Sequence, residues 1–257
     1  MEINLNCDLG ERSLSNGDIN DLKLLKLINT TSIACGYHAG DYLTMNATIL
    51  SAKKNNVSVG AHPGFNDKEN FGRKKINLTK NELKNLIREQ LEIINEISLL
   101  NNWPISHVKP HGALNNMACE DIEISLIISK TIKEFDRDLI FIVSPTTQME
   151  VAAKKVQIKY ACEIFADRNY QDNGQLVPRN NKNALILDPI IGSKNILKML
   201  NESSIITYSG KKIKCDIDTV CIHGDNKNAQ MLAEELIKIL SANDYNFLNL
   251  NKLAKLN

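Results

Sequence analysis

Five segments of the chain each contain a strand-like run that ends in an ionisable side chain, and a glycine follows that side chain within two residues. The segments are INLNCDLGE, IACGYHAGD, VSVGAHPGF, VKPHGALNN and TVCIHGDN, and the side chains are Asp8, His38, His62, His111 and His223. Glycine lets the backbone turn sharply where a strand ends, which leaves the preceding side chain over a pocket. The fifth histidine, His107, does not share this position, so we expect it to be structural or partly exposed and to lie outside the pocket.

Short apolar runs alternate with helical patterns along the chain. Strands are expected at 3–8, 33–38, 57–62, 107–109, 139–143, 160–165 and 219–223. Helices are expected at 18–29, 41–54, from 79 to about 97, at 120–134, 147–156, from 188 and at 226–241. A small hairpin is expected at 206–215, and the tail 244–257 is ambiguous. We find no linker and no repeat, so we assign one domain, 1–257.

This alternation predicts a mainly parallel α/β sheet. The run 139–143 is purely apolar, which fits a strand buried on both faces. In a barrel the carboxyl ends of all strands meet at one face, whereas an open sheet brings together only those near its switch point. The repeated strand-end pattern therefore favours a closed or nearly closed barrel of seven (β/α) units.

Composition excludes several classes of function. The net charge is +1, which argues against nucleic acid or a membrane surface as a partner. No apolar run approaches the roughly 18–20 residues that span a bilayer, and the first residues do not resemble a secretory signal. We therefore expect a cytoplasmic protein. The six cysteines include no C-x-x-C pair, which favours buried thiols. Cys221 could alternatively be a nucleophile.

Polar neighbours add further candidates for a site. Asp41 and Asp225 follow His38 and His223 closely and could orient their rings, although Asp41 could instead cap a helix. Lys109 lies two residues before His111, so both point to the same side of a strand. Three loop arginines could bind anions or form ordinary ion pairs, namely Arg73, Arg168 and Arg179.

Common catalytic motifs are missing from the sequence. It contains no G-x-x-x-x-G-K-[ST], no G-x-G-x-x-G, no H-E-x-x-H and no G-x-S-x-G. A P-loop, a dinucleotide-binding fold and a serine hydrolase of that type therefore have little support. Asp and His side chains at neighbouring strand ends would suit Zn²⁺ or another divalent ion, so a metal site stays open.

Eight segments, in order, resemble the LamB/YcsF family. They are NCDLGE (6–11), CGYHAGD (35–41), GAHPGF (60–65), FGR (71–73), VKPHGAL (108–114), FADR (165–168), LVPR (176–179) and CIHGDN (221–226). The resemblance implies an incomplete (β/α)7 TIM-like barrel of the glycoside hydrolase/deacetylase type. It also implies cleavage of 5-oxo-L-proline to L-glutamate, with ATP and Mg²⁺ as co-substrate and 5-oxoprolinase subunits B and C as partners. Asn115 stands where the family usually has Tyr, which affects fine specificity more than the class of reaction.

For this reaction we expect Asp8 and His111 to act as base and acid, and Lys109 to neutralise anionic charge. The expected substrate-binding residues are His38, Asp41, His62, Arg73, Asp167, Arg168, Arg179, His223 and Asp225. One alternative is a stand-alone metal-dependent deacetylase or amidohydrolase with Asp8, His38 and His62 as ligands. Another is a lactam or sugar-acid binder without catalytic activity.

Overall fold

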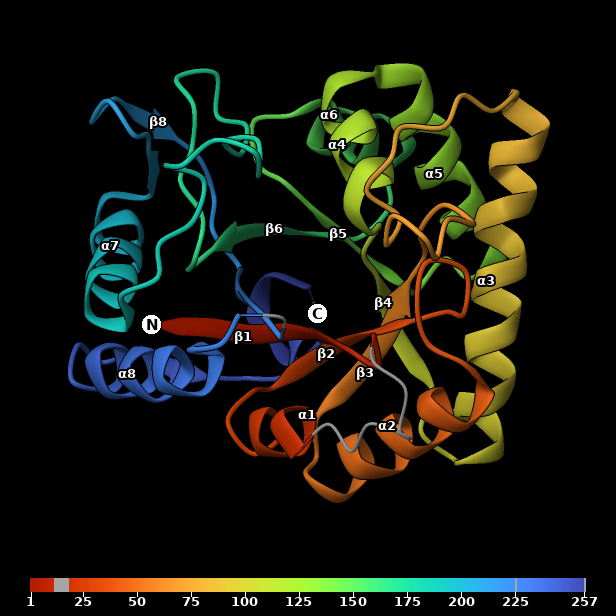
Figure 1. The fold of residues 1–257 in the computed structure, drawn as a ribbon, viewed down its shortest axis with the longest axis horizontal. Helices are drawn as coiled ribbons and strands as arrows, with labels where there is room; N and C mark the ends of the chain where they lie inside the picture. The colour runs from red at the N-terminus through yellow and green to blue at the C-terminus, as the bar shows by residue number, and fades with distance from the viewer. Residues whose placement is uncertain (12–18, 225, 257) are drawn as a thin grey trace.

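A ring of seven parallel strands forms the centre of the computed structural model, which describes residues 1–11, 19–224 and 226–256 (Figure 1). The strands are β1 (Glu2–Leu9), β2 (Thr30–Ala34), β3 (Ser58–His62), β4 (Ile105–Val108), β5 (Ile140–Val143), β6 (Tyr160–Phe165) and β9 (Thr219–His223). Each strand pairs with the next, and β9 pairs with both β6 and β1, which closes the ring. The expected seven-stranded barrel is confirmed.

Helices surround this ring (Figure 1). They are α1 (Ile19–Leu24), α2 (Tyr42–Lys54), α3 (Lys80–Leu100), α4 (Gly112–Glu120), α5 (Ile122–Phe135), α6 (Gln148–Val156), α7 (Pro189–Glu202) and α8 (Ala229–Ser241). A capping box opens α3, where Glu82 accepts from the Thr79 N–H at 2.7 Å and donates its own N–H to Thr79 Oγ1 at 3.3 Å. Asp188 caps α7. The sequence did not predict α4.

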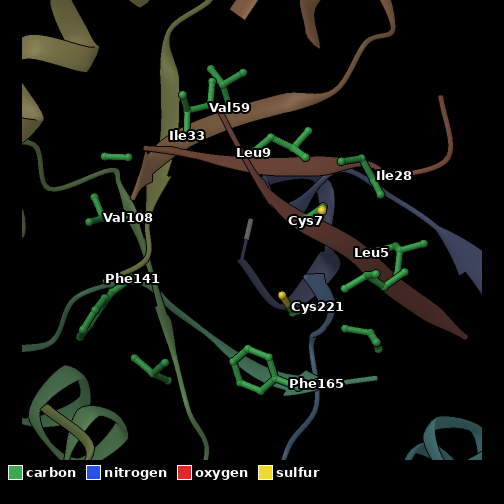
Figure 2. Close-up of a cluster of buried hydrophobic side chains, with 14 of the residues drawn as sticks. Leu5, Cys7, Leu9, Ile28, Ile33, Val59, Val108, Phe141, Phe165 and Cys221 are labelled. Atoms are coloured by element: carbon green, nitrogen blue, oxygen red, sulfur yellow. The ribbon is translucent and has the colours of Figure 1, made fainter. Parts of the chain in front are cut away.

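The two faces of the barrel wall differ in polarity. The outer face packs against the helices through apolar side chains such as Leu5, Leu9, Ile33, Val59 and Phe141 (Figure 2). The inner face is largely polar. Its buried side chains include Asn4, Asn6, Thr30, Ser32, Ser58, His107 and Thr219. Successive side chains of each strand point to opposite faces of the barrel wall. Polar side chains can therefore fill the interior while apolar side chains pack outside.

Hydrogen bonds satisfy the polar groups inside the barrel. Asn4 donates to Thr30 Oγ1 at 2.8 Å and accepts from Thr219 Oγ1 at 2.6 Å. The His107 ring nitrogens lie 2.9 Å from Ser106 Oγ and 3.3 Å from Ser32 Oγ. His107 is structural, as one of the two expectations had it, but it is fully buried rather than partly exposed. It is also the third residue of β4, not the first residue of its strand.

One predicted strand is displaced. The apolar residues 33–38 suggested a strand, but β2 covers Thr30–Ala34 and His38 lies four residues beyond its end. Thr30, Thr31 and Ser32 look like turn residues in the sequence. They form a strand because the interior and the neighbouring backbone bind their hydroxyls, as when Thr31 donates to the Cys7 carbonyl at 2.9 Å.

Residues outside the barrel strands complete the fold. The expected hairpin is confirmed as β7 (Ser204–Ile206) paired antiparallel with β8 (Lys212–Lys214). The tail forms β10 (Asn246–Phe247), which pairs with β1, and two short 3-10 helices, η2 (Leu250–Lys252) and η3 (Ala254–Leu256). It closes the amino end of the barrel with an apolar cluster of Leu250, Leu253 and Leu256 on Ile140, Ile142 and Ala161. Within the described part of the chain, no helix is both long and apolar enough to cross a membrane.

Candidate active site

A pocket of about 380 Å³ opens at the carboxyl ends of the strands. Ends of β1, β3, β6 and β9 and the loops after β4 and β5 form its wall, with Asp8, His62, Phe165, His223, Lys109, His111 and Ser144 among the lining residues. The structure thus brings four of the five expected strand-end side chains to one pocket. The fifth, His38, is buried behind His111 and does not line the pocket.

Lys109 lies at the floor of the pocket and contacts two carboxylates. Its ammonium lies 2.8 Å from Asp8 Oδ1 and 2.7 Å from Glu163 Oε1, and it donates to Asn6 Oδ1 at 3.2 Å. Burial alone would lower the pKa of Lys109, but Asp8 and Glu163 raise it well above its ordinary value. Lys109 therefore stays charged inside the barrel, because an ion pair offsets the cost of taking each charge out of water.

The same ion pairs determine the state of the groups around Lys109. Burial raises the pKa of Asp8, yet the pKa lies below its ordinary value because His62, Lys109 and His223 favour the carboxylate. Burial raises the pKa of Glu163 above its ordinary value. Lys109 lowers this pKa and the charge of Asp8 raises it, so the net change is upward. Cys221 Sγ lies 3.1 Å from the Lys109 ammonium, and burial raises the thiol pKa well above its ordinary value. Cys221 is therefore a protonated, packed thiol and not the nucleophile that the sequence left open.

Three histidine rings pack together beside Asp8. His62 Nδ1 lies 2.7 Å from the Lys109 carbonyl, and His111 Nε2 lies 2.9 Å from the Phe71 carbonyl. Because a carbonyl can only accept, each of these nitrogens must carry the ring proton. The His38 ring stacks on His111, with ring centroids 3.8 Å apart and planes 5° apart.

Burial favours the neutral form of these three rings. It lowers the pKa of His62 to about 4 and that of His111 to about 3, and it lowers the pKa of His38 further. The lowered pKa of His111 counts against its expected role as an acid that titrates near neutrality. In the neutral ring, the one N–H is committed to the Phe71 carbonyl.

Glu11 adds a carboxylate to the three rings. Its Oε1 lies 3.3 Å from His111 Nδ1, 3.6 Å from His38 Nε2 and 3.9 Å from His62 Nε2. Three neutral imidazoles and a carboxylate, with ligand atoms within 4.8 Å of one another, fit a divalent cation. The metal ligands expected from the sequence were Asp8, His38 and His62. The group in the structure shares His38 and His62 with this prediction and also contains Glu11 and His111, and Asp8 Oδ2 lies 3.4 Å from His62 Nε2.

His223 forms a separate dyad on the far wall of the pocket. Its Nδ1 lies 2.7 Å from Asp167 Oδ1, and its ring stacks on Phe165 with 5.2 Å between ring centroids. Burial raises the pKa of Asp167, but His223 outweighs it and the net pKa is lowered. Asp167 thus orients His223, the role that the sequence offered to Asp225. Asp225 lies outside the described residues.

The remaining predicted site residues occupy different places. Arg73 and Arg179 are exposed and line the pocket. Arg168 also lines it, but its guanidinium donates to the carbonyls of Val177 at 2.7 Å and Ala184 at 3.3 Å, so it holds the loop that follows β6. Asp41 is exposed, caps α2 by accepting from Thr44 N at 2.8 Å, and does not line the pocket.

Sequence reasoning missed Glu11 and Glu163. Glu163 had a usable signal, because a lone acidic residue in the apolar run YACEIF stands on the same face as Phe165 and requires a buried partner. Glu11 gave a weaker signal, since an acidic residue just after a turn is usually solvated. Asn115, the position that departs from the family pattern, lies on the pocket wall.

The fold and the site define a TIM-like (β/α) barrel protein with an ionisable pocket at the carboxyl ends of its strands. A peptidoglycan N-acetylglucosamine deacetylase from Eubacterium rectale has a similar fold, with a TM-score of 0.52 and 13% identity over 98% of this chain and 89% of that one. The chain belongs to the LamB/YcsF family, whose model matches residues 3–255. The family resemblance noted in the sequence is confirmed.

Other relatives share much more of the sequence. A protein of Staphylococcus epidermidis, named as the A subunit of 5-oxoprolinase, is 44% identical over 229 residues, covering 89% of this chain and 91% of that protein. A Staphylococcus aureus protein of the same name is 39% identical over 240 residues, covering 93% and 96%. The crystal structure of a lactam utilization protein from Thermus thermophilus matches with a TM-score of 0.89 and 32% identity, covering 96% and 99%.

Proposed function

We propose that the chain is the lactam-opening subunit of an ATP-dependent 5-oxoprolinase, which converts 5-oxo-L-proline to L-glutamate together with subunits B and C. The observation that carries this proposal is the identity of 39–44%, over most of the chain, to proteins named as the A subunit of 5-oxoprolinase. The missing P-loop favours binding of ATP, with Mg²⁺, by a partner subunit. An ATP-dependent reaction and six free cysteines favour the cytoplasm.

The pocket suits a small anionic substrate. Its volume of about 380 Å³ lies near the lower end of the range for ligand sites. Arg73 and Arg179 on its wall can bind the carboxylate of the lactam or a phosphoryl group attached to it. Lys109 cannot take this role directly, because Asp8 and Glu163 already surround its ammonium.

Ring opening needs activation because the lactam amide is stabilised by resonance and the product amine can reclose on its own carboxylate. Transfer of the terminal phosphoryl group of ATP to the amide oxygen releases ADP and activates the ring carbon. Water then adds to that carbon, and the carbon–nitrogen bond breaks as the nitrogen takes a proton. This leaves an acyl phosphate, and a second water hydrolyses it to glutamate and phosphate.

Two groups on the pocket wall are placed for the proton transfers. Asp8 is ionised and held by Lys109, so it can accept a proton from the attacking water. His223 is oriented by Asp167, so it can carry a proton to the departing nitrogen. His223 takes over the acid role expected for His111, because the His111 ring is buried and neutral.

The test measures glutamate release from 5-oxoproline with and without ATP and with and without subunits B and C. We expect turnover only in the complete mixture, and Asp8→Asn should lower it by about 10²–10⁴-fold. Asp41→Asn is the matched control, since this aspartate is exposed and does not line the pocket. Full ATP-coupled turnover by the chain alone would contradict the division of labour.

The same experiment separates the alternatives. Metal-dependent hydrolysis of an amide without ATP would favour the stand-alone deacetylase or amidohydrolase. That alternative has less support, since the deacetylase neighbour shares the fold at only 13% identity. Tight binding of the lactam without turnover in the complete mixture would favour a binding protein.

A further inference from the structure

We propose that Glu11, His38, His62 and His111 form a binding site for one divalent transition-metal ion of the zinc type. The four side chains meet where the ends of β1, β3 and β4 and the loop after β2 come together. The ion itself would be bound by the isolated chain. Its binding is therefore independent of the proposed reaction and of the partner subunits.

The first argument comes from two nitrogens that face each other. His62 Nε2 and His111 Nδ1 are 2.9 Å apart, which is a hydrogen-bond distance. The opposite nitrogen of each ring donates to a backbone carbonyl, of Lys109 and of Phe71 respectively. When both rings are neutral, neither facing nitrogen carries a proton and two lone pairs point at each other, while Asp8 Oδ2 lies 3.4 Å from His62 Nε2. A cation beside both nitrogens turns this repulsion into attraction, and backbone carbonyls commonly orient metal-binding histidines in this way.

The second argument comes from His38. Its side chain is buried, with 1% of its surface exposed, and neither ring nitrogen has a hydrogen-bond partner among the described residues. Leaving a buried polar group unpaired costs roughly 1–3 kcal/mol. His38 Nε2 lies 3.6 Å from Glu11 Oε1, so this nitrogen is directed into the cluster. A metal ion bound there would satisfy it.

Four of the six separations between the ligand atoms agree with a small ion, and the two between His38 and the other rings are within 4.8 Å. Zinc binds nitrogen and oxygen ligands at about 2.0–2.2 Å, so tetrahedral ligands lie about 3.3–3.6 Å from one another. The observed separations are 2.9 Å between His62 and His111, and 3.3, 3.6 and 3.9 Å from Glu11 to the three rings. These values bracket the tetrahedral spacing.

Close packing holds the rings in this arrangement. A Cβ added at Gly64 would lie 2.6 Å from His38 Nδ1, and one added at Gly72 would lie 2.7 Å from His38 Cβ and 3.0 Å from His111 Cδ2. Gly72 also has a φ of +61°, which favours glycine. The backbone thus presses against the outer side of the rings and restricts their positions.

A second group of possible ligands lies nearby but is a poor cation site. Asp8, Cys221 and His223 also have ligand atoms within 4.8 Å of one another. The ammonium of Lys109 lies 2.8 Å from Asp8 and 3.1 Å from Cys221, so a positive charge already occupies this space. The Glu11 cluster has three imidazole rings around its carboxylate instead. Glu11, His62 and His111 line the pocket, which gives an ion a way in.

The test is a titration of the chelator-treated full chain with Co²⁺, followed by its visible absorption, and with Zn²⁺ in competition. We expect one equivalent of Co²⁺ to bind with the strong visible bands of a low-coordinate nitrogen and oxygen site, and Zn²⁺ to displace it. His38→Phe keeps an aromatic ring in the stack but removes both nitrogens. Loss of an outer partner of a ligand typically costs 10–100-fold in metal affinity, so loss of a ligand should cost at least about 100-fold.

Controls make each outcome decisive. Glu11→Gln provides a second ligand variant at the pocket wall in case His38→Phe does not fold, as judged by circular dichroism. His223→Asn and Cys221→Ser remove ligands of the other group and should leave Co²⁺ affinity unchanged. The proposal is overturned if the wild-type chain binds no Co²⁺ or Zn²⁺, which would leave a shared proton between His62 and His111. It is also overturned if affinity survives both ligand variants or is lost in Cys221→Ser.

Discussion

Replacement of Lys109 by Met removes the ammonium that lies between the buried carboxylates of Asp8 and Glu163. The methionine side chain is similar in length and fits the apolar part of the lysine, so the main change is electrostatic. Asp8 and Glu163 would then share the barrel interior without their cation, at distances that Lys109 now bridges with contacts of 2.8 and 2.7 Å. We expect a strongly destabilised protein.

The size of the effect follows from the burial of all three groups. Removing one partner of a buried ion pair typically costs about 3–5 kcal/mol, because a charge remains without compensation. For a chain of this size, each kcal/mol lowers Tm by about 2–4 °C. Lys109→Met should therefore lower Tm by about 6–20 °C at neutral pH. Adding Glu163→Gln should restore part of the loss, because it removes one of the two like charges.

The loss should depend on pH in a defined direction. Without Lys109, burial raises the folded-state pKa values of the two carboxylates above their unfolded values. The resulting penalty is present above those folded-state pKa values and fades as the pH falls and a carboxylate takes up a proton. The difference in Tm between wild type and Lys109→Met should therefore shrink as the pH is lowered from about 7 to about 5.

Thermal melts of wild type, Lys109→Met and the double variant test this reasoning. Lys80→Met is the matched control, since Lys80 pairs with Glu123 at 3.0 Å on the surface, with 75% of the lysine side chain exposed. It should leave Tm essentially unchanged. If Lys109→Met melts like Lys80→Met, then the lysine does not compensate buried charge, and the account of the pocket floor is incorrect.

Two further predictions concern residues that the structure assigns to different roles. Asp41→Ala should lower the free energy of unfolding by roughly 0.5–2 kcal/mol, because the α2 cap is lost. Glutamate formation by the assembled enzyme should stay at the wild-type rate. A large loss of rate would place Asp41 in the site after all. The pKa of Asp167 is lowered because His223 outweighs the effect of burial, so this carboxylate stabilises the fold above its unfolded pKa of about 3.9 and less as the pH falls below it. The Tm difference between wild type and Asp167→Asn should therefore be largest near neutral pH and shrink toward pH 3. A difference that grows on acidification would contradict the pairing of Asp167 with His223.

The sequence predicted the barrel well where one face of a strand gives a clear signal. The bounds 160–165 and 219–223 coincide with β6 and β9, because apolar residues and turn signals delimit both runs. It failed where the inner face is polar. Thr30, Thr31 and Ser32 belong to β2, since the barrel interior supplies partners that no local pattern reveals.

The candidate site shows the same division. Strand-end positions brought Asp8, His62, His111 and His223 to one pocket, because topology alone places them there. Their protonation states depend on burial and on contacts with residues far away in the chain, and sequence position does not give these. Glu163 lies 54 residues from Lys109 and could be recognised as its partner only in three dimensions.

The closure of the barrel has a consequence for how the chain folds as it is made. β1 is synthesised first among the strands, yet two of its neighbours are β9 and β10, and its Asn4 accepts a hydrogen bond from Thr219, 215 residues later. On the ribosome, β1 can pair early only with β2, and its other edge stays open until more than 200 residues have followed. Such long-range closure slows folding and leaves an unpaired edge exposed to aggregation. The nascent chain should therefore be a substrate for chaperones that shield strand edges during synthesis, and its yield should fall more steeply than its stability when those chaperones are depleted.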